Sequence, residues 1–384
     1  MIAVSPEIRK SLIKTIQKIR GSKLIVYFTG DRRFASAVIA EDAVRPLYEH
    51  LLSIGKNSKI DLFLYSRGGD VSVPWRIVSM FREFCDEFSV LIPYKAHSAA
   101  TLISLGADKI VMGKKAELGP IDPILVKGVT GESAAPPPEI SVEDVNSYIS
   151  FLKERVNITD QSALMQLVSI LANYLTPLTL GSVNRQNSHI RLVARKLLTY
   201  KREKPEEARI NSIIETLTEK IYSHGHAIGR KEAQEIGLPV EIPSNELEET
   251  IWKLYLEYEK ILKLDEPIDP LLILVGKEEA HLDGVPIALI ESEEKLHVFR
   301  VQMDFKRKRQ IPSNPQINLN IGLSLPPNIR PEDIPTNIQQ ILQQMINQIA
   351  QRLPQLVQQE IIRQSPEIGV DVRVYGGKWE EEEE

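Results

Sequence analysis

Apolar positions in the first 112 residues alternate between a strand-like and a helix-like period. Short β-branched and aromatic runs such as KLIVYFT are typical of buried strands. The pattern predicts four strands, at residues 23–29, 59–65, 88–93 and 109–112, and four helices, at residues 6–20, 42–53, 71–84 and from about residue 97. Strands that alternate with helices indicate parallel βαβ units, so the sequence predicts an α/β fold.

The pattern changes after residue 122. Residues 130–139 (TGESAAPPPE) are rich in Gly, Ser and Pro and predict a loop. Helical periodicity dominates from residue 141 to about residue 263, with a break at residues 223–229. We therefore expect a core of residues 1–265 with a helical segment at residues 141–222, and a separate C-terminal α+β region at residues 266–384.

One Gln-rich helix is expected in the C-terminal region. Its apolar residues recur at helical spacing and share one face: Ile338, Ile341, Leu342, Met345, Ile346 and Ile349. Such a stripe favours a core or a subunit interface over a membrane surface. Pro354 is expected to kink or end this helix.

Composition excludes several classes of protein. Hydrophobic residues make up 42% and charged residues 26% of the 384-residue chain, which is enough to bury a core. The 47 basic and 52 acidic residues give a net charge of −5, which argues against a nucleic-acid coat. With Cys85 as the single cysteine, neither a disulfide framework nor a Cys-based zinc site is possible. We expect no cofactor and no metal, since the acidic residues and His281 show no metal-ligand spacing.

Membrane signals are weak. The N-terminal segment is amphipathic and lysine-rich, unlike a signal peptide. The uncharged stretch at residues 161–184 contains polar side chains and Pro177, so a buried or interfacial helix is the favoured interpretation. We expect a cytoplasmic protein, with peripheral membrane attachment left open.

Three short segments are informative together. Gly68 and Gly69 follow a predicted strand, where backbone N–H groups can face a ligand as an oxyanion hole; the alternative is an ordinary tight turn. Ser98 stands between a strand and a helix of small residues, which suits a nucleophile but also a simple helix N-cap. A third segment, residues 112–123, reads as a strand and a structured turn that ends near Asp122.

The order of these three segments, ending in ADKIVMGKKAELGPIDP, resembles the Clp protease/crotonase-like fold. More closely, the chain is similar to the serine dehydrogenase proteinase family, which is related to signal peptide peptidases. The resemblance implies that Ser98 is the nucleophile and that Gly69 (or Gly68) and Ala99 form the oxyanion hole. It further implies a polypeptide substrate, held beside the helix predicted to begin at Val71, and a homo-oligomeric assembly.

The position of the general base differs from the Clp pattern, because this sequence has Asp122 in the turn where the Clp protease has its histidine. A lysine, as in signal peptide peptidases, is the favoured base, and its candidates are Lys114, Lys115, Lys127 and Lys153. A competing arrangement joins Ser98 and Asp122 to a histidine from the loop that holds His224 and His226. His97 is adjacent to the serine, and adjacent side chains usually point apart.

Three functions follow from this reading. The leading hypothesis is a serine endopeptidase that forms an acyl-enzyme on Ser98 and acts on extended or unfolded polypeptides. The second is a catalytically inactive oligomeric scaffold of the same fold that binds peptides or a membrane partner. The third is crotonase-type acyl-CoA chemistry, which also uses a backbone oxyanion hole.

Overall fold

The computed structural model describes residues 6–121, 124–126, 139–141, 147–174, 177–221, 225–311 and 335–382. The chain divides into two compact units. Unit 1 consists of Met1–Ile268, Gly284–Gln302 and Tyr375–Glu384, and unit 2 consists of Asp269–Asp283 and Met303–Val374. The boundary predicted at residue 265 lies close to the first change of unit, after Ile268, and two later segments return to unit 1.

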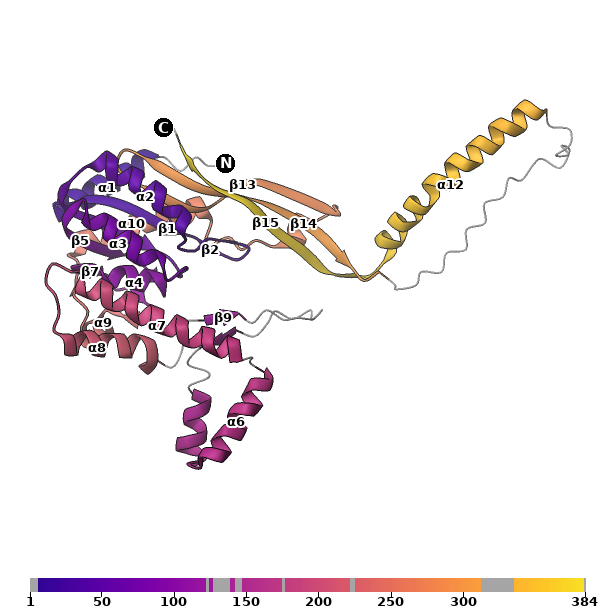
Figure 1. Cartoon of the computed structure of the whole chain (residues 1–384). Coiled ribbons are helices and arrows are strands. Elements are labelled where there is room, and N and C mark those ends of the chain that lie inside the picture. Colours follow the sequence, from indigo (N-terminus) through magenta and orange to yellow (C-terminus); the bar gives the residue numbers. More distant parts are fainter. Residues whose placement is uncertain are drawn as a thin grey trace. The chain divides into compact units, whose positions relative to one another are not determined.

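The centre of unit 1 is a parallel sheet, as the alternating pattern predicted (Figure 1). Its parallel strands are β1 (Lys23–Thr29), β4 (Asn57–Tyr65), β5 (Cys85–Ile92), β7 (Lys109–Met112) and β12 (Val240–Glu241). The predicted and observed limits of β1 agree. The helix predicted to reach residue 84 ends at Arg82, and β5 begins at Cys85, three residues before the predicted strand.

Strands from the end of the chain extend this sheet. They are β13 (Glu279–Glu291), β14 (Leu296–Arg309) and β15 (Glu367–Glu381), and the order is β12-β7-β5-β4-β1-β13-β14-β15. β13 pairs antiparallel with β1, with Val26 opposite Glu291. The C-terminal strands therefore contribute residues to the sheet of unit 1.

Helices cover both faces of the sheet, so the strands read as continuous apolar runs. On one face, α1 (Pro6–Arg20) and α10 (Asn245–Leu262) pack with Val26 and Phe28 of β1. On the other face, Ile25 and Tyr27 belong to a core that includes residues of α2 (Val44–Ile54), α3 (Val73–Arg82) and α4 (Ala99–Leu105). α7 (Pro177–Thr199) packs on α3 and α4 and completes this core.

The middle of the chain is mainly helical, as predicted. Besides α7 it contains η2 (Phe151–Arg155), α6 (Gln161–Tyr174), α8 (Glu207–Glu215), η3 (Thr216–Lys220) and α9 (Arg230–Ile236). The uncharged stretch is divided between α6, which ends at Tyr174, and α7, which begins at Pro177. Within the described ranges, no helix is both long enough and apolar enough to cross a bilayer.

Short strands lie between the larger elements. β6 (Lys95–Ala96), β8 (Glu117–Leu118) and β11 (Ile228–Gly229) form a small second sheet in the order β11-β8-β6. Two further pairs are β2 (Asp31–Arg32) with β3 (Ala35–Ser36), and β9 (Ile124–Val126) with β10 (Glu139–Ser141); η1 (Glu41–Ala43) precedes α2. The small sheet matters because Ser98 comes two residues after the end of β6.

Unit 2 holds the outer parts of β13, β14 and β15 together with α11 (Pro270–Ile273) and α12 (Thr336–Gln364). α12 is the predicted Gln-rich helix. It runs through Pro354 without ending there. Four residues of its apolar stripe are exposed, namely Ile338, Ile341, Met345 and Ile349.

Candidate active site

Ser98 occupies a strained backbone position between β6 and α4. Its φ and ψ are 51° and −111°, a combination that residues other than glycine rarely adopt. Such a conformation costs about 1–3 kcal/mol and is found mainly at functional sites. The side chain of Ser98 is partly exposed, whereas Ala99 and Ala100 beyond it are fully buried. The strand-to-helix turn thus holds the serine hydroxyl where a substrate can reach it.

The glycine pair lies directly against the serine. Gly68 has a φ of 118°, and a Cβ there would lie 2.8 Å from Ser98 Cβ and 3.3 Å from its Oγ. Gly69 has a φ of 155°, and a Cβ there would lie 2.1 Å from the carbonyl oxygen of Ile39. Ile39 brackets the pair, since its N–H donates to Gly68 O and its carbonyl accepts from Asp70 N, both at 2.8 Å. Both positions therefore require glycine.

Ser66 determines which of the two glycine N–H groups is available. Its buried Oγ accepts hydrogen bonds from Gly68 N at 3.1 Å and from the Thr29 hydroxyl at 2.7 Å. In the part of the chain that the structure describes, Gly69 N and Ala99 N donate to no partner. One of these N–H groups directly follows Ser98 and the other directly follows Gly68, which packs against Ser98, so the two could stabilise an oxyanion.

Sequence reasoning did not single out Ser66. A signal was present, because a serine two residues before a glycine commonly closes a turn with its hydroxyl.

Thr101 fixes the other wall of the site and was also missed. Its buried hydroxyl oxygen lies 2.8 Å from both Ala96 O and Gly119 O, which share its one proton as acceptors, and it accepts from Gly119 N at 3.2 Å. A Cβ at Gly119 would lie 3.0 Å from His97 Cβ, so the turn after β8 packs closely against the residue before the serine. Thr101 thereby ties the first turn of α4 to the segment that leads toward Asp122.

His97 forms a dyad with Glu117 and not with Ser98. Its Nε2 lies 3.1 Å from Glu117 Oε1. Burial lowers the pKa of His97, and the nearby Glu117 carboxylate opposes this shift. Among the described residues, none hydrogen-bonds to Ser98 Oγ. This agrees with the expectation that adjacent side chains point apart.

Two of the described candidate lysines have contacts elsewhere, and the third is exposed. Lys115 Nζ lies 4.4 Å from the centre of the Tyr94 ring. Lys114 Nζ lies 3.6 Å from Glu248 on α10. Lys153 is an exposed residue of η2. The structure does not bring these three amines into hydrogen-bonding contact with Ser98.

The histidine alternative is described only in part. His226 is exposed, and its Nε2 lies 2.9 Å from Glu232 Oε1. Asp122, Lys127 and His224 lie outside the described residues. Both the lysine dyad and the arrangement of Ser98, histidine and Asp122 therefore stay predictions.

The one cysteine is unsuited to act as a nucleophile. Burial raises the pKa of the Cys85 thiol to about 12, and its Sγ donates to Phe81 O at 3.3 Å. A thiol held protonated in this way does not attack a carbonyl at neutral pH.

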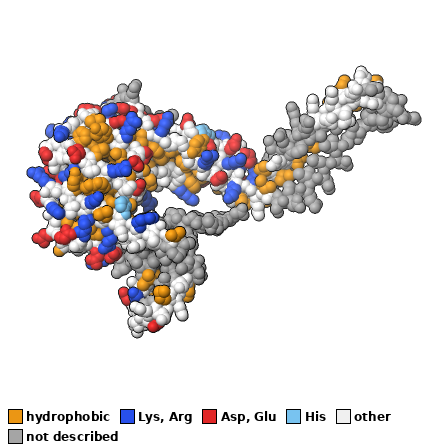
Figure 2. All heavy atoms as spheres, in the orientation of Figure 1, with side chains coloured by type: hydrophobic (Ala, Val, Ile, Leu, Met, Phe, Trp, Pro, Cys, Tyr) orange, Lys and Arg blue, Asp and Glu red, His pale blue; other side chains and the backbone are white. Residues whose placement is uncertain are grey.

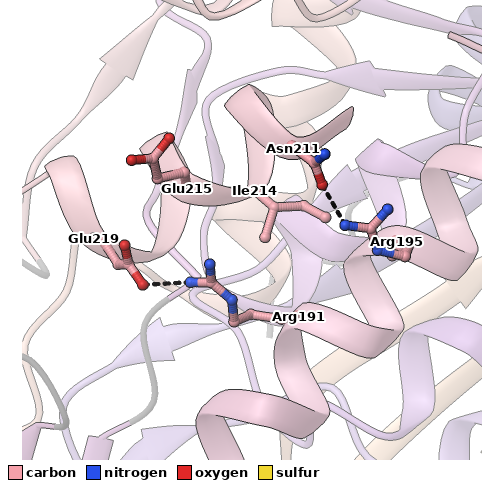
Figure 3. Close-up of a pocket in the computed structure, with 6 residues that line it drawn as sticks. All are labelled: Arg191, Arg195, Asn211, Ile214, Glu215 and Glu219. Atoms are coloured by element: carbon pink, nitrogen blue, oxygen red, sulfur yellow. Dashed lines mark hydrogen bonds and ion pairs between the residues drawn. The ribbon is translucent and has the colours of Figure 1, made fainter. Parts of the chain in front are cut away.

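A hollow away from Ser98 lies between α7, α8 and η3 (Figure 3). It has a volume of about 310 Å³, and Arg191 and Arg195 point into it. Arg191 bonds to Thr218 at 3.1 Å and to Glu219, and Arg195 bonds to Asn211. Both arginines of the lining are therefore engaged with neighbouring polar side chains, and Ser98 is not among the residues that line the hollow.

Comparison with known proteins agrees with the geometry around Ser98. Residues 8–136 match the family of ClpP-like SDH-type serine proteinases. The matched segment contains the glycine pair, Ser98 and Thr101. Together with the parallel sheet, the match establishes the predicted α/β, Clp-like fold.

Two uncharacterized proteins of Methanocaldococcus jannaschii are similar in sequence. One is 31% identical over 201 residues, which cover 52% of this chain and 59% of that protein. The other is 39% identical over 64 residues, which cover 17% of this chain and 22% of that protein. The chain thus spans less than two thirds of the length of either relative.

Two solved protease structures are also similar. An alanine mutant of the 1510-N membrane-bound stomatin-specific protease is 17% identical, with a TM-score of 0.32 over 55% of this chain and 79% of that one. ClpP1 from Listeria monocytogenes is 14% identical, with a TM-score of 0.32 over 61% of this chain and 99% of that one.

Proposed function

We propose that the protein is a serine endopeptidase that cleaves extended or unfolded polypeptides. The observation that carries the proposal is the strained Ser98, which packs against Gly68 and is followed by Ala99; among the described residues, the N–H groups of Gly69 and Ala99 have no acceptor. In the proposed reaction, Ser98 Oγ attacks the peptide carbonyl carbon and transfers its proton to the general base. The oxyanion accepts hydrogen bonds from the two N–H groups, the amine leaves with a proton from the base, and water hydrolyses the acyl-enzyme.

For the base we propose a lysine, with Lys127, Lys115 and Lys153 as candidates. A neutral amine can take the serine proton once burial has lowered its pKa. The alternative uses a histidine, His224 or His226, oriented by Asp122. Individual alanine variants separate the two proposals, because a lost base lowers turnover by about 10²–10⁴-fold. In the variants that stay active, the dependence of turnover on pH then reports the pKa of the general base.

The proposed substrate binds as an added strand. Backbone N–H and C=O groups near Gly68 and Gly69, with α3 beside them, would hold it by main-chain hydrogen bonds. Assembly into a homo-oligomer is part of the same proposal.

The direct activity test uses the full chain with a fluorescent unfolded protein as substrate. We expect hydrolysis by the wild type and loss of hydrolysis in Ser98→Ala. Ser188→Ala is the matched control, because Ser188 is an exposed serine of α7. Equal hydrolysis by Ser98→Ala and the wild type would contradict the proposal.

One observation favours the second candidate, a peptide-binding scaffold without catalysis. No residue that the structure describes hydrogen-bonds to Ser98 Oγ, whereas an active serine needs a base within reach. Peptide binding without turnover, unchanged in Ser98→Ala, would support the scaffold.

A further inference from the structure

Three potential metal ligands from distant parts of the chain meet at one place in unit 1. They are Glu49 of α2, His297 of β14 and Glu381 of β15, and one ligand atom from each lies within 4.8 Å of the others. The His297 side chain is 5% exposed, whereas those of Glu49 and Glu381 are 32% and 46% exposed. The imidazole therefore forms the floor of the cluster, and the carboxylates face water, from which a cation can enter.

Two basic side chains on the outer side of the cluster already hold the carboxylates in place. Arg45 Nε donates to Glu49 Oε1 at 3.1 Å, and Lys295 Nζ donates to Glu381 Oε1. The second oxygen of Glu49, Oε2, lies 3.2 Å from His297 Nε2. Carboxylates that bind metals are commonly hydrogen-bonded on their outer side in this way. Each acid has one oxygen held by a cationic side chain and a second oxygen that can serve as a ligand.

The imidazole has a partner for its other nitrogen. His297 Nδ1 lies 3.1 Å from Nε2 of the buried His50, and His50 Nδ1 lies 2.8 Å from Ser292 Oγ. A serine hydroxyl both donates and accepts, so this chain of hydrogen bonds can run in either direction. When Nε2 of His297 gives its lone pair to a cation, Nδ1 carries the proton and donates it to His50. Metal-binding histidines nearly always have such an acceptor.

We propose that Glu49, His297 and Glu381 bind a divalent cation of the zinc class, with water as the fourth ligand. One imidazole with two carboxylates suits Zn²⁺, whereas Mg²⁺ and Ca²⁺ prefer oxygen ligands alone. Tetrahedral zinc, with bonds of about 2.0–2.1 Å, separates its ligand atoms by about 3.3 Å. The pair of Glu49 Oε2 and His297 Nε2 already has a separation of 3.2 Å. The exposed Glu381 closes the site by a side-chain rotation.

The proposed ion is structural. It connects α2, near the start of the chain, with β15, near its end, so it holds the last strand against the rest of unit 1. Bound metal stabilises the folded state because the unfolded chain has no preformed site. The site is independent of Ser98, and its test does not depend on peptidase activity.

The experiment is a calorimetric titration of the chelator-treated full chain with Zn²⁺. We expect one ion per chain, a melting temperature that rises with Zn²⁺, and at least a tenfold loss of affinity in Glu381→Gln. Glu380→Gln is the matched control, because it removes the same charge from the neighbouring position and should bind as the wild type does. His281→Ala removes a histidine that pairs with Asp304 at 2.7 Å, and it should also leave binding unchanged.

A second measurement covers the case in which a His297 variant fails to fold. The exposed Glu381 can be replaced without disturbing the core, so Glu381→Gln should melt at the wild-type temperature in the absence of metal. Co²⁺ should give the intense visible absorption of a tetrahedral site in the wild type and in Glu380→Gln but not in Glu381→Gln. No stoichiometric binding by the wild type, or equal affinity in Glu381→Gln and Glu380→Gln, would overturn the proposal.

Discussion

At the scale of single residues, the geometry around Ser98 depends on small and hydroxyl side chains that are not themselves nucleophiles. Gly69 approaches Ile39, Ser66 engages Gly68 N, and Thr101 holds Gly119. The glycines and Ser98 could be predicted from the sequence, since their residue types stand at strand ends. Thr101 could not, because its role arises from hydrogen bonds between segments 18 residues apart.

Gly69→Ala tests the oxyanion hole. A Cβ would lie 2.1 Å from the Ile39 carbonyl oxygen, at a φ that alanine rarely adopts, so the loop must move and displace Gly69 N. Loss of one oxyanion donor lowers turnover by about 10²–10³-fold. Steady-state peptide hydrolysis measures the effect. Gly229→Ala is the control, because its φ of −72° is ordinary and a Cβ there has open space, and a similar loss in both variants would contradict the account.

Ser66→Ala tests the hydroxyl behind the glycine pair. The variant leaves the buried Gly68 N–H and the Thr29 hydroxyl without their acceptor, at a cost of about 1–3 kcal/mol in the free energy of unfolding. Urea denaturation measures this difference. Ser188→Ala, at an exposed helical position, should lie within about 0.5 kcal/mol of the wild type. The role assigned to Ser66 would be wrong if the two variants were equally stable.

At the scale of elements, periodicity predicted the strands well because both faces of the parallel sheet are buried. β1 has the predicted limits, and six of its seven residues are buried. The predictions were less accurate where local geometry decides the limits. α3 ends at Arg82, whose guanidinium binds Asp108, and the following residues turn into β5. α12 passes through Pro354, although proline usually disrupts a helix interior.

A buried lysine whose titration should be measurable lies two residues after the end of α7. Lys201 is 9% exposed, and burial lowers its pKa to about 7, against the attraction of Asp108 and with the repulsion of Arg82 and Arg209. Between about pH 7 and pH 10.5 the unfolded chain keeps the proton that the folded chain has lost. Stability from this group therefore rises with pH, by up to about 1.4 kcal/mol per unit.

Lys201→Met should remove that rise. Urea denaturation at pH 7, 8 and 9 should give the variant a higher free energy of unfolding than the wild type, and this difference should become smaller as the pH increases. Lys196→Met is the control. The Nζ of Lys196 lies 5.4 Å from the centre of the Trp75 ring, and this variant should keep the wild-type dependence of stability on pH. A wild-type slope in Lys201→Met would contradict the burial argument.

At the scale of the whole molecule, the sequence indicated the Clp-like core but not how the chain ends. Nothing in the apolar pattern shows that β13 will pair with β1, because strand partners distant in the sequence leave no local signal. The contacts of Trp379, which donates to Asp42 Oδ2 at 2.9 Å and stacks edge-on with Phe299 at 5.2 Å, are equally hidden in the sequence.

Self-association is the prediction at this scale. Ile341 and Met345 of α12 are each 54% exposed on a helix face whose polar residues are uncharged, so two copies could pair without charge repulsion. We expect light scattering to give a mass that is a multiple of 43.4 kDa. Ile341→Glu with Met345→Glu should lower it, whereas Gln343→Glu with Gln344→Glu adds the same charge on exposed polar positions and should not. A monomeric wild type would contradict this prediction.

The central claim is that Ser98 is a nucleophile beside a working oxyanion hole. A fluorophosphonate probe tests it most directly, because the probe phosphonylates an activated serine and mass spectrometry locates the adduct. We predict one adduct per chain on Ser98 in the wild type and in Ser188→Ala, and none in Ser98→Ala. Equal labelling of the wild type and Ser98→Ala, or no labelling of the folded wild type, would contradict it.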